Sequence, residues 1–548
     1  MRMGRWSAAA LAAASGAAWA AACGAAATAA PAVTAAANAT LPEAARWWSD
    51  IALLAGDDTE GRLTGSSGFD LAAERVIARF KAEGLEPAAD GGYRQPVAFE
   101  RQVVAQGESS AELSAADGEI RPLRVGEELL IATGGAPRPD RVDAPLVFVG
   151  YGLHLPEFGE DDFAGLDIRN KIVVVLSGGP AEVPGAVKAN ARFARTEWLG
   201  RAGAAGVISL TTPKQVEIPW VRQKLLAAQS GMYLADATLR DTPDGFFIAS
   251  IDPDASEAVF KGSGHTFAEL CGLADRSAPL PRVALAESLR ATIIAHREAA
   301  SSPNLVAKLP GRDRKLASEF VAVSAHLDHL GSGAPIAGDR IYNGAMDDAS
   351  GVASVLDIAH RLHGAKRRPR RSILFLIFTA EEKGLLGSHY FALRPTVPRG
   401  SIVADLNFDM PLPLWPLKSV IAQGAAESTL GADAEAIAAA QGITLVPDPL
   451  PDRNTFIRTD QFSFVREGIP ALAFKFGFAR DTPEFQIEHD WRATRYHSPS
   501  DDLDQPGVLP NEAVKLDAFV AALMLRVADA DAKPQWLPTS IFKLGSGP

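Results

Sequence analysis

The stretch "SILFLIFTAEEKGLLGS", from Ser372 to Ser388, joins an apolar run to two adjacent acidic residues. The apolar run shows no alternation of polar and apolar residues, which is typical of a strand covered on both faces in a parallel sheet. Glu381 and Glu382 follow where this strand is expected to end. Functional sites of α/β proteins lie at the carboxyl ends of their strands, so two carboxylates here indicate a chemical role.

Further apolar segments of the same kind lie on both sides of this stretch and alternate with segments of helical spacing. The expected strands cover residues 319–325, 372–380, 402–409 and 470–476, and the expected helices cover residues 349–363, 383–393, 425–441 and 511–527. Strands that alternate with helices predict an α/β fold with a mixed, mostly parallel central sheet flanked by helices.

The chain is long enough for more than one domain, and its composition changes along its length. The segments "APLVFVGYG" and "NKIVVVLSG" are β-branched runs bounded by turn residues, and "CGLADRSAPLPR" marks a later boundary. We therefore expect an inserted smaller α+β domain over residues 144–285. The main domain is expected in two parts, residues 41–143 and 286–531, followed by a C-terminal tail over residues 532–548.

The N-terminal residues 1–23 have the layout of a secretory signal, with two arginines, an Ala-rich apolar run and small residues. Cys23 is placed where a lipoprotein signal carries its lipidated cysteine, although the usual upstream Leu is an Ala; simple cleavage and release is the alternative. Residues 24–40 are rich in Ala and Thr and are expected to be a disordered tether. The sequence thus predicts an exported protein, either periplasmic, membrane-anchored as a lipoprotein, or secreted.

Charge and cysteine content narrow the class of protein further. The formal net charge is −12, which argues against nucleic acid or an anionic membrane surface as a partner. Cys271 is the only cysteine after Cys23, so no disulfide can form within the processed chain. The oligomeric state cannot be inferred from the sequence.

Histidines and carboxylates stand at the expected strand ends and in the loops between them. They are His326 and Asp328 in "AHLDHLG", Asp347 and Asp348 in "YNGAMDDASGVA", Glu381 and Glu382, Asp409 in "LNFDM", and His497 in "YHSPSDD". Imidazole and carboxylate groups together suit zinc. A single catalytic zinc needs three protein ligands, and the larger set here favours two metal ions with one carboxylate left as a base.

These motifs, in this order, resemble the co-catalytic two-zinc aminopeptidase family, in the subgroup with an inserted protease-associated domain. The resemblance extends from about residue 41 to residue 527 and includes "EGRLTGSSG" near the N-terminus and "VFVGYGL" in the insert. It implies the zinc exopeptidase fold, two Zn²⁺ per chain, and peptide substrates cleaved at the N-terminal bond by a zinc-activated water.

The resemblance also implies a role for each site residue. Asp347 bridges both metals, His326 and Asp409 complete one metal site, and Glu382 and His497 complete the other. Glu381 is the general base. Asp328 accepts the second ring N–H of His326, as metal-bound histidines usually require, and Tyr496 stabilises the oxyanion.

Other residues could take some of these places. His329 and His489 are rivals as ligands, and Asp348 is the rival of Asp347 as the bridge. Asp348 also stands where the family often has Asn.

The alternative functions are a carboxypeptidase or cyclase reaction on the same fold and a receptor-like relative without activity. A carboxypeptidase would need an arginine cluster for the substrate carboxylate, and no such cluster can be placed from the sequence. The role of the inserted domain and the side-chain preference for the substrate also stay open.

Overall fold

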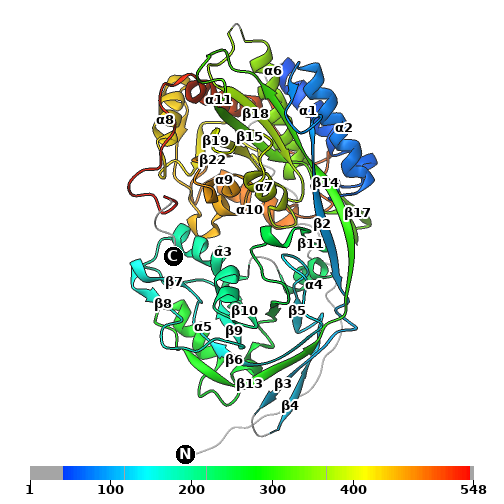
Figure 1. The fold of residues 1–548 in the computed structure, drawn as a ribbon, viewed down its shortest axis with the longest axis vertical. Helices are drawn as coiled ribbons and strands as arrows, with labels where there is room; N and C mark the ends of the chain where they lie inside the picture. Colours follow the sequence, from blue (N-terminus) through cyan, green and yellow to red (C-terminus); the bar gives the residue numbers. More distant parts are fainter. Residues whose placement is uncertain (1–40, 116–117, 217–218, 366, 544–548) are drawn as a thin grey trace, which may run out of the picture. The chain divides into compact units, whose positions relative to one another are not determined.

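The strand that contains the opening stretch lies in the middle of a ten-stranded sheet in the computed structural model (Figure 1). The structure describes residues 41–543 except 116–117, 217–218 and 366. The predicted signal at 1–23, its Cys23 and the predicted tether at 24–40 lie outside the described residues, as does the end of the predicted tail. Within the described residues, no helix is both long and apolar enough to cross a membrane.

Four parallel strands form the centre of this sheet. Their order is β18 (Ser372–Phe378), β15 (Phe320–His326), β19 (Ile402–Phe408) and β22 (Ala471–Phe476). Every residue of β15, β18 and β19 is buried, as expected for strands covered on both faces. The parallel pairing brings the carboxyl ends of all four strands to one edge.

Antiparallel strands extend the sheet on both sides. Beyond β18 lie β14 (Ala295–Leu309), β2 (Arg94–Val104) and β11 (Gly231–Leu234); beyond β22 lie β20 (Ser419–Gln423) and β21 (Thr444–Leu445), with β21 parallel to β20. The short β1 (Glu86–Pro87) pairs with β14. The predicted α/β fold with a mixed sheet flanked by helices is confirmed; the sheet is parallel at its centre, whereas most of its outer pairings are antiparallel.

Helices cover both faces of the sheet. One face is covered by helices that surround the largest buried core, namely α1 (Pro42–Leu54), α2 (Ser67–Ala82), α6 (Ser350–His363), α8 (Leu430–Gln441) and α11 (Pro510–Asp529). The other face is covered by α7 (Leu386–Leu393) and α9 (Gln461–Arg466). Shorter elements are α10 (Pro483–Thr494) and the hairpin of β16 (Gly331–Ile336) and β17 (Asp339–Tyr342).

Two predicted helices begin later than the sequence pattern indicates. The helix expected from residue 383 begins at Leu386, because the peptide N–H groups of Gly384 and Leu385 close a turn on the carbonyl of Glu381. The helix expected from residue 425 begins at Leu430, after a turn over residues 424–427. The first difference places a turn over residues 381–385 between the two glutamates and the helix.

A second sheet of eight strands lies in the sequence between β2 and β14. Its order is β4 (Ile120–Leu123), β3 (Ser110–Ala115), β13 (Val283–Thr292), β6 (Arg141–Phe148), β9 (Ile172–Leu176), β10 (Gly206–Leu210), β12 (Phe247–Ile251) and β5 (Leu129–Ile131). Its helices are α3 (Gly185–Arg201), α4 (Trp220–Ala227) and α5 (Phe267–Asp275), and a two-stranded sheet pairs β7 (His154–Leu155) with β8 (Glu160–Asp161).

The bounds of the insert stay a proposal. The eight-stranded sheet takes three strands from residues 110–131, before the predicted start at residue 144, and its last strand ends at Thr292. We therefore propose that the insert comprises residues 105–294. Residues 231–234 are an exception, because they pair with β2 in the ten-stranded sheet.

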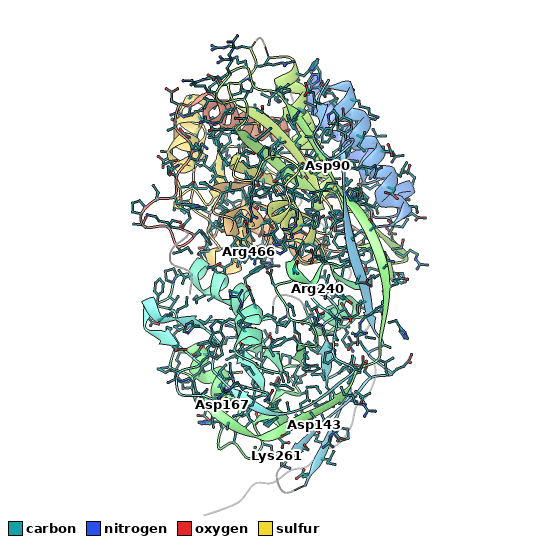
Figure 2. All side chains as sticks on the ribbon, viewed as in Figure 1. Asp90, Asp143, Asp167, Arg240, Lys261 and Arg466 are labelled. Carbon is teal, nitrogen blue, oxygen red and sulfur yellow. The ribbon has the colours of Figure 1, made fainter. Side chains whose placement is uncertain are left out.

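Arg466, labelled in Figure 2, ties the insert to the main domain. Its guanidinium makes two hydrogen bonds to the carboxylate of Asp241, at 2.7 and 2.8 Å. The ring of Phe193 on α3 stacks under the same guanidinium, 5.2 Å from its centre. A bidentate, half-buried pair of this kind is geometrically more specific than an exposed ion pair.

We expect Arg466→Leu to lower the free energy of unfolding by about 1 kcal/mol, because a half-buried ion pair is partly screened by solvent. Urea unfolding measures this value. Arg399→Leu is the matched control, since Arg399 makes an exposed pair with Glu467 at 3.2 Å and should change stability by less than about 0.5 kcal/mol. Equal effects of the two substitutions would contradict the role given to Arg466.

Candidate metal centre

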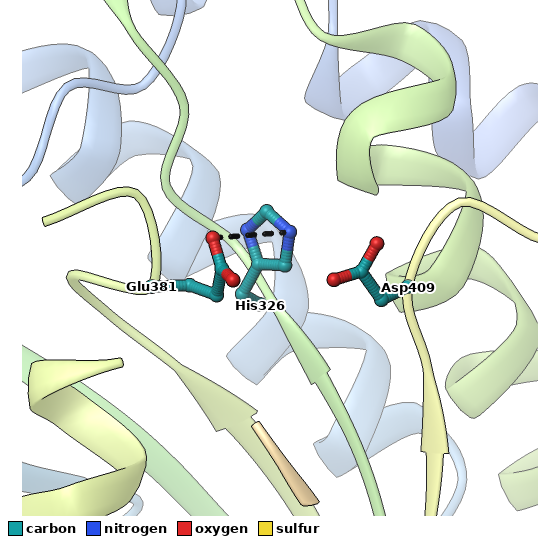
Figure 3. Close-up of side chains that lie close together, drawn as sticks. All are labelled: His326, Glu381 and Asp409. Atoms are coloured by element: carbon teal, nitrogen blue, oxygen red, sulfur yellow. Dashed lines mark ion pairs between the residues drawn. The ribbon is translucent and has the colours of Figure 1, made fainter. Parts of the chain in front are cut away.

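Three of the predicted site residues come from the ends of three neighbouring central strands. His326 is the last residue of β15, Asp409 follows β19, and Glu381 stands three residues after β18. Figure 3 shows these side chains turned toward one another across the sheet edge. One ligand atom from each lies within 4.8 Å of the others, so the three could surround one ion.

The carboxylate of Asp347 lies between two histidines. Its Oδ1 is 3.3 Å from Nε2 of His326, and its Oδ2 is 3.4 Å from Nε2 of His497. Asp347 belongs to the segment Ala345–Ala349 just before α6, where its φ and ψ are not helical. Each oxygen of a single carboxylate therefore faces a different imidazole.

A second group of ligand atoms lies on the other side of Asp347. Glu382 Oε2 is 3.2 Å from His497 Nε2, and Glu382 Oε1 is 2.8 Å from His329 Nδ1. Both histidines could bind an ion there, and His329, Asp347 and Glu382 lie within ligand distance of one another. His497 Nε2 approaches both Asp347 and Glu382.

Glu381 is near the first group without being its closest carboxylate. Its Oε2 lies 3.9 Å from His326 Nε2, which is farther than Asp347 Oδ1. Burial, together with repulsion from Asp409 and Glu382, outweighs the attraction of His326 and raises the pKa of the Glu381 carboxyl well above its usual range. A carboxyl group with a raised pKa can both accept and return a proton near neutral pH.

The contact expected between His326 and Asp328 differs in its acceptor. Nδ1 of His326 lies 3.0 Å from the backbone carbonyl oxygen of Asp328, whereas the carboxylate oxygen Oδ1 is 4.0 Å away. A carbonyl oxygen only accepts hydrogen bonds, so Nδ1 carries a proton, and in the neutral ring Nε2 is the nitrogen that keeps a lone pair. The ring proton of His326 is therefore on Nδ1, as expected, but its acceptor is the Asp328 carbonyl oxygen. The Asp328 carboxylate accepts hydrogen bonds from other groups.

That carboxylate holds the two adjacent glutamates in place. The peptide N–H groups of Glu381 and Glu382 donate to it at 3.0 and 3.4 Å, and the hydroxyl of Thr64 donates at 3.0 Å. Asp328 is fully buried. It therefore fixes the backbone from which both glutamate side chains reach the site.

Asp348 and Asp501 hold the backbone of the neighbouring loops in place by accepting peptide N–H groups. Asp348 accepts the peptide N–H groups of Gly351 and Met410, both at 3.0 Å, and so joins the start of α6 to the loop that carries Asp409. Asp501 accepts the N–H groups of Met346 and Asp347 at 2.9 and 3.0 Å. Asp348, the rival for the bridging position, thus makes its contacts away from the two histidines.

Arg62 is a site residue that sequence reasoning missed. Its guanidinium is fully buried and donates to the carbonyl oxygens of Leu54, Leu327, Asn343 and Gly344, at 2.6–2.9 Å. Burial lowers its pKa to about 10, so it stays charged at neutral pH. Its only sequence signal is its place in "EGRLTGSSG", a loop rich in Gly and Ser.

Tyr496 and His489 differ in how they lie. The ring of Tyr496 stacks on that of His497, with 3.9 Å between the ring centres. The guanidinium carbon of Arg492 lies over the Tyr496 ring, 5.2 Å from the ring centre. His489 is half-exposed on α10, 3.5 Å from the carboxylate of Asp490. Tyr496 therefore borders the site, whereas no contact with Asp347 or Glu382 is found for His489 among the described residues.

The site residues suit zinc on their own chemistry. His326 Nε2, Glu382 Oε1 and Asp409 Oδ1 are buried and, among the described residues, have no hydrogen bond of suitable geometry. Their nearest charged groups are Asp347 at 3.3 Å, His329 at 2.8 Å and Lys475 at 3.5 Å. Buried polar atoms without partners are rare in folded proteins and call for an explanation. Imidazole nitrogen and carboxylate oxygen are the donor types that zinc takes.

Comparison with known proteins agrees with this site. A mixed α/β sheet with histidines and carboxylates at its carboxyl edge defines the class of protein, an α/β protein with a candidate two-metal centre. Residues 304–523 match Peptidase family M28, so this part of the chain is an M28 domain. The matched segment contains every ligand candidate described above.

Individual relatives match shorter segments. Leupeptin-inactivating enzyme 1 of Streptomyces exfoliatus is 35% identical over 112 residues, which is 20% of this chain and 23% of that protein. The probable leucine aminopeptidase 2 of Aspergillus oryzae is 35% identical over 108 residues, 20% of this chain and 19% of that protein. The aligned segments thus span less than a quarter of either relative.

A solved structure shows the same fold over most of the chain. The aminopeptidase from Aneurinibacillus sp. strain AM-1 matches with a TM-score of 0.51 and 20% identity, covering 88% of this chain and 93% of that one. At this identity the likeness establishes the fold.

We expect Arg62→Met to lower the free energy of unfolding by about 3 kcal/mol or more, because it leaves buried carbonyl oxygens without donors. The amount of metal bound per chain should also decrease in this variant, because Leu327, Asn343 and Gly344 flank the loops that carry the ligand candidates. Urea unfolding and metal analysis measure the two effects. Arg75→Met is the control, because Arg75 makes an exposed pair with Asp58; a similar loss in that variant would contradict the role of Arg62.

Proposed function

We propose that this protein is a zinc-dependent aminopeptidase that hydrolyses the N-terminal bond of peptides. The position of Asp347 between His326 and His497 carries the proposal, because one carboxylate shared by two histidine-containing groups suits two metal ions. The M28 match and the zinc-compatible donor set support it.

We further propose that two Zn²⁺ ions are held by the residues that the sequence indicates. His326 and Asp409 would hold one ion, Glu382 and His497 the other, and Asp347 both. Bound zinc would supply Lewis-acid activation of the scissile carbonyl and of the attacking water. His329 would orient Glu382 through the 2.8 Å contact between Nδ1 and Oε1.

The chain's own groups then perform the proton transfers. Glu381 would take a proton from the attacking water and return it to the leaving amine, a role that the position of its Oε2, 3.9 Å from His326 Nε2, supports. Asp328 holds the peptide groups of Glu381 and Glu382, and so keeps the base at a fixed place. Tyr496 would stabilise the oxyanion at the border of the pocket.

The acidic residues of the pocket favour an aminopeptidase, whereas the cations in the same lining, Arg222, Arg453, Arg458, Lys475 and Arg492, are what a carboxypeptidase would use, so the two reactions need a direct test. Asp347, Glu381 and Asp409 line a cavity of about 410 Å³. These carboxylates suit a free α-ammonium group better than a free carboxylate. Leu-Ala-Ala should therefore be cleaved to release leucine and N-acetyl-Leu-Ala-Ala should not be cleaved; release of C-terminal alanine from both peptides would favour the carboxypeptidase.

The protein would act outside the cytoplasm. The signal-like sequence of residues 1–23 supports export, and Cys23 would give a lipid anchor if that signal is of the lipoprotein type.

Metal removal tests the cofactor. We expect about two zinc ions per chain in active protein, loss of peptidase activity after treatment with a chelator, and recovery on adding zinc back. Elemental analysis of the protein before and after treatment measures the count. A count near one in fully active protein would contradict the two-metal site.

Substitution of Glu381 and of Glu382 should impair the enzyme in different ways, one through turnover and the other through metal binding. Glu381→Gln should keep its zinc and lose about 10²–10⁴-fold in kcat, because proton transfer is lost. Glu382→Gln should lose zinc, because one ligand is replaced by a weaker donor. Metal analysis beside kcat separates the two, and a Glu381→Gln variant with full turnover would remove the general-base assignment.

A further inference from the structure

Two cavities meet beside the candidate metal centre. The cavity lined by Asp347, Glu381 and Asp409 has a volume of about 410 Å³. A larger cavity, of about 1210 Å³, lies between the insert and the segment around residues 453–458. Arg453 and Arg458 line both cavities, so a bound molecule could extend from one into the other.

The insert contributes walls to both cavities. Arg222 on α4 lines the smaller cavity and donates from Nη2 to the carbonyl oxygen of Tyr496 at 2.8 Å. Residues of α3, including Lys188 and Arg192, line the larger one. A molecule that leaves the metal centre in this direction must pass along the insert.

The larger cavity is lined by cations, and the described residues that line it include no Asp or Glu. The cations are Lys188, Arg192, Lys214, Arg453 and Arg458. The smaller cavity adds Arg222, Lys475 and Arg492 beside its carboxylates, and Lys475 Nζ lies 3.5 Å from Asp409 Oδ1. This concentration of positive charge stands in a chain whose net charge is −12.

None of these cations is without a partner in the protein. Lys188 and Arg192 each donate to a backbone carbonyl oxygen, of Pro180 and Gly178, at 3.1 Å, which leaves the side-chain charge in place. Lys214 lies 2.7 Å from the carboxylate of Asp275, and Arg453 lies 2.8 Å from Glu488, which also pairs with Arg492. One carboxylate shared by two guanidinium groups still leaves a net positive charge. Cavities with walls of one charge sign concentrate ligands of the opposite sign.

The smaller cavity therefore carries charges of both signs, whereas the charged residues described in the lining of the larger cavity are all cations. The carboxylates of Asp347, Glu381 and Asp409 suit the α-ammonium group of a peptide, and the larger cavity suits groups of negative charge. A peptide whose first residue lies at the metal centre would place its following residues among the cations. The peptide's own polarity, from ammonium to carboxylate, matches this arrangement.

We propose that the cationic cavity binds a carboxylate on the leaving-group side of the substrate, so that the enzyme prefers peptides with a negative charge after the cleaved bond. The proposal deepens the proposed aminopeptidase function and rests on it. The carboxylate comes either from an acidic side chain or from the free C-terminus of a short peptide.

Matched peptides distinguish the two sources. Leu-Ala-Ala as the free acid against its C-terminal amide tests the terminal carboxylate, and Leu-Glu-Ala-amide against Leu-Gln-Ala-amide tests the side chain. We expect at least one carboxylate-bearing peptide to have about tenfold higher kcat/KM than its neutral partner at low salt, and the ratio to shrink as ionic strength rises. Ratios near one for both pairs would overturn the proposal.

Variants assign the preference to the cavity. In Lys188→Gln and Arg192→Gln the acid-to-neutral ratio of kcat/KM should fall by about threefold or more, because each removes one positive charge. Arg192→Lys should restore most of the ratio. Arg169→Gln is the control, because Arg169 is an exposed residue of the insert outside both linings; an equal fall in this variant would overturn the assignment to the cavity.

Binding to an inactive variant separates this proposal from the peptidase itself. Calorimetric titration of zinc-loaded Glu381→Gln should show tighter binding of the preferred acid than of its neutral partner. Hydrolysis of all four peptides at equal rates would leave the aminopeptidase standing and remove the preference. Selective binding of the acid, with no hydrolysis by the native enzyme, would support the cationic binding site and contradict the aminopeptidase function.

Discussion

Three buried carboxylates that each accept two backbone N–H groups determine the shape of the centre. Asp328 holds the peptide groups of Glu381 and Glu382, Asp348 joins the start of α6 to Met410, and Asp501 holds the segment that ends at Asp347. Burying a carboxylate is costly unless it is paired, and pairs of peptide N–H groups supply part of that pairing. The cluster therefore divides into acids that fix loops and acids that face the interior.

The acids that face the interior are the ones left for a cation. They are Asp347, Glu381, Glu382 and Asp409, and the histidines beside them present nitrogen atoms to the same space. Arg62 stabilises the loops around the centre by donating hydrogen bonds to the carbonyl oxygens of Leu327, Asn343 and Gly344. Its positive charge is also attracted by the carboxylates of Asp501 and Asp328. A cation-binding centre of this density needs loops held by groups other than the ligands themselves.

Much of the fold and of the centre could be predicted, because both follow from local patterns. The apolar runs of β15, β18 and β19 are unbroken, so strand type and parallel order were evident, and the ligand candidates stand directly at the ends of those runs. The carbonyl of Asp328 as partner of His326 was not predictable, since the sequence does not distinguish a backbone acceptor from a side-chain acceptor two residues away.

Other features depend on contacts between distant segments. Arg62 had the appearance of a loop charge, and its buried position depends on carbonyl groups more than 260 residues away. The strands over residues 110–131 are short and carry no strong periodicity, so the start of the second sheet was expected too late. The cationic cavity combines residues from 188 to 458, which no single stretch of sequence reveals.

The pairing of β2 with β14 has a consequence for how the chain could change over time. The two strands pair from Arg94 with Leu305 to Val104 with Ala295, so the residues on either side of segment 105–294 are direct neighbours. Topologically the whole insert is the loop of one very long hairpin, and lengthening a loop adds only slowly to its closure entropy. An ancestor could thus gain, lose or exchange the segment while the strands that bear the ligand candidates keep their register, so that the proposed selection of substrates by the insert is separable from the proposed bond cleavage in the history of the molecule.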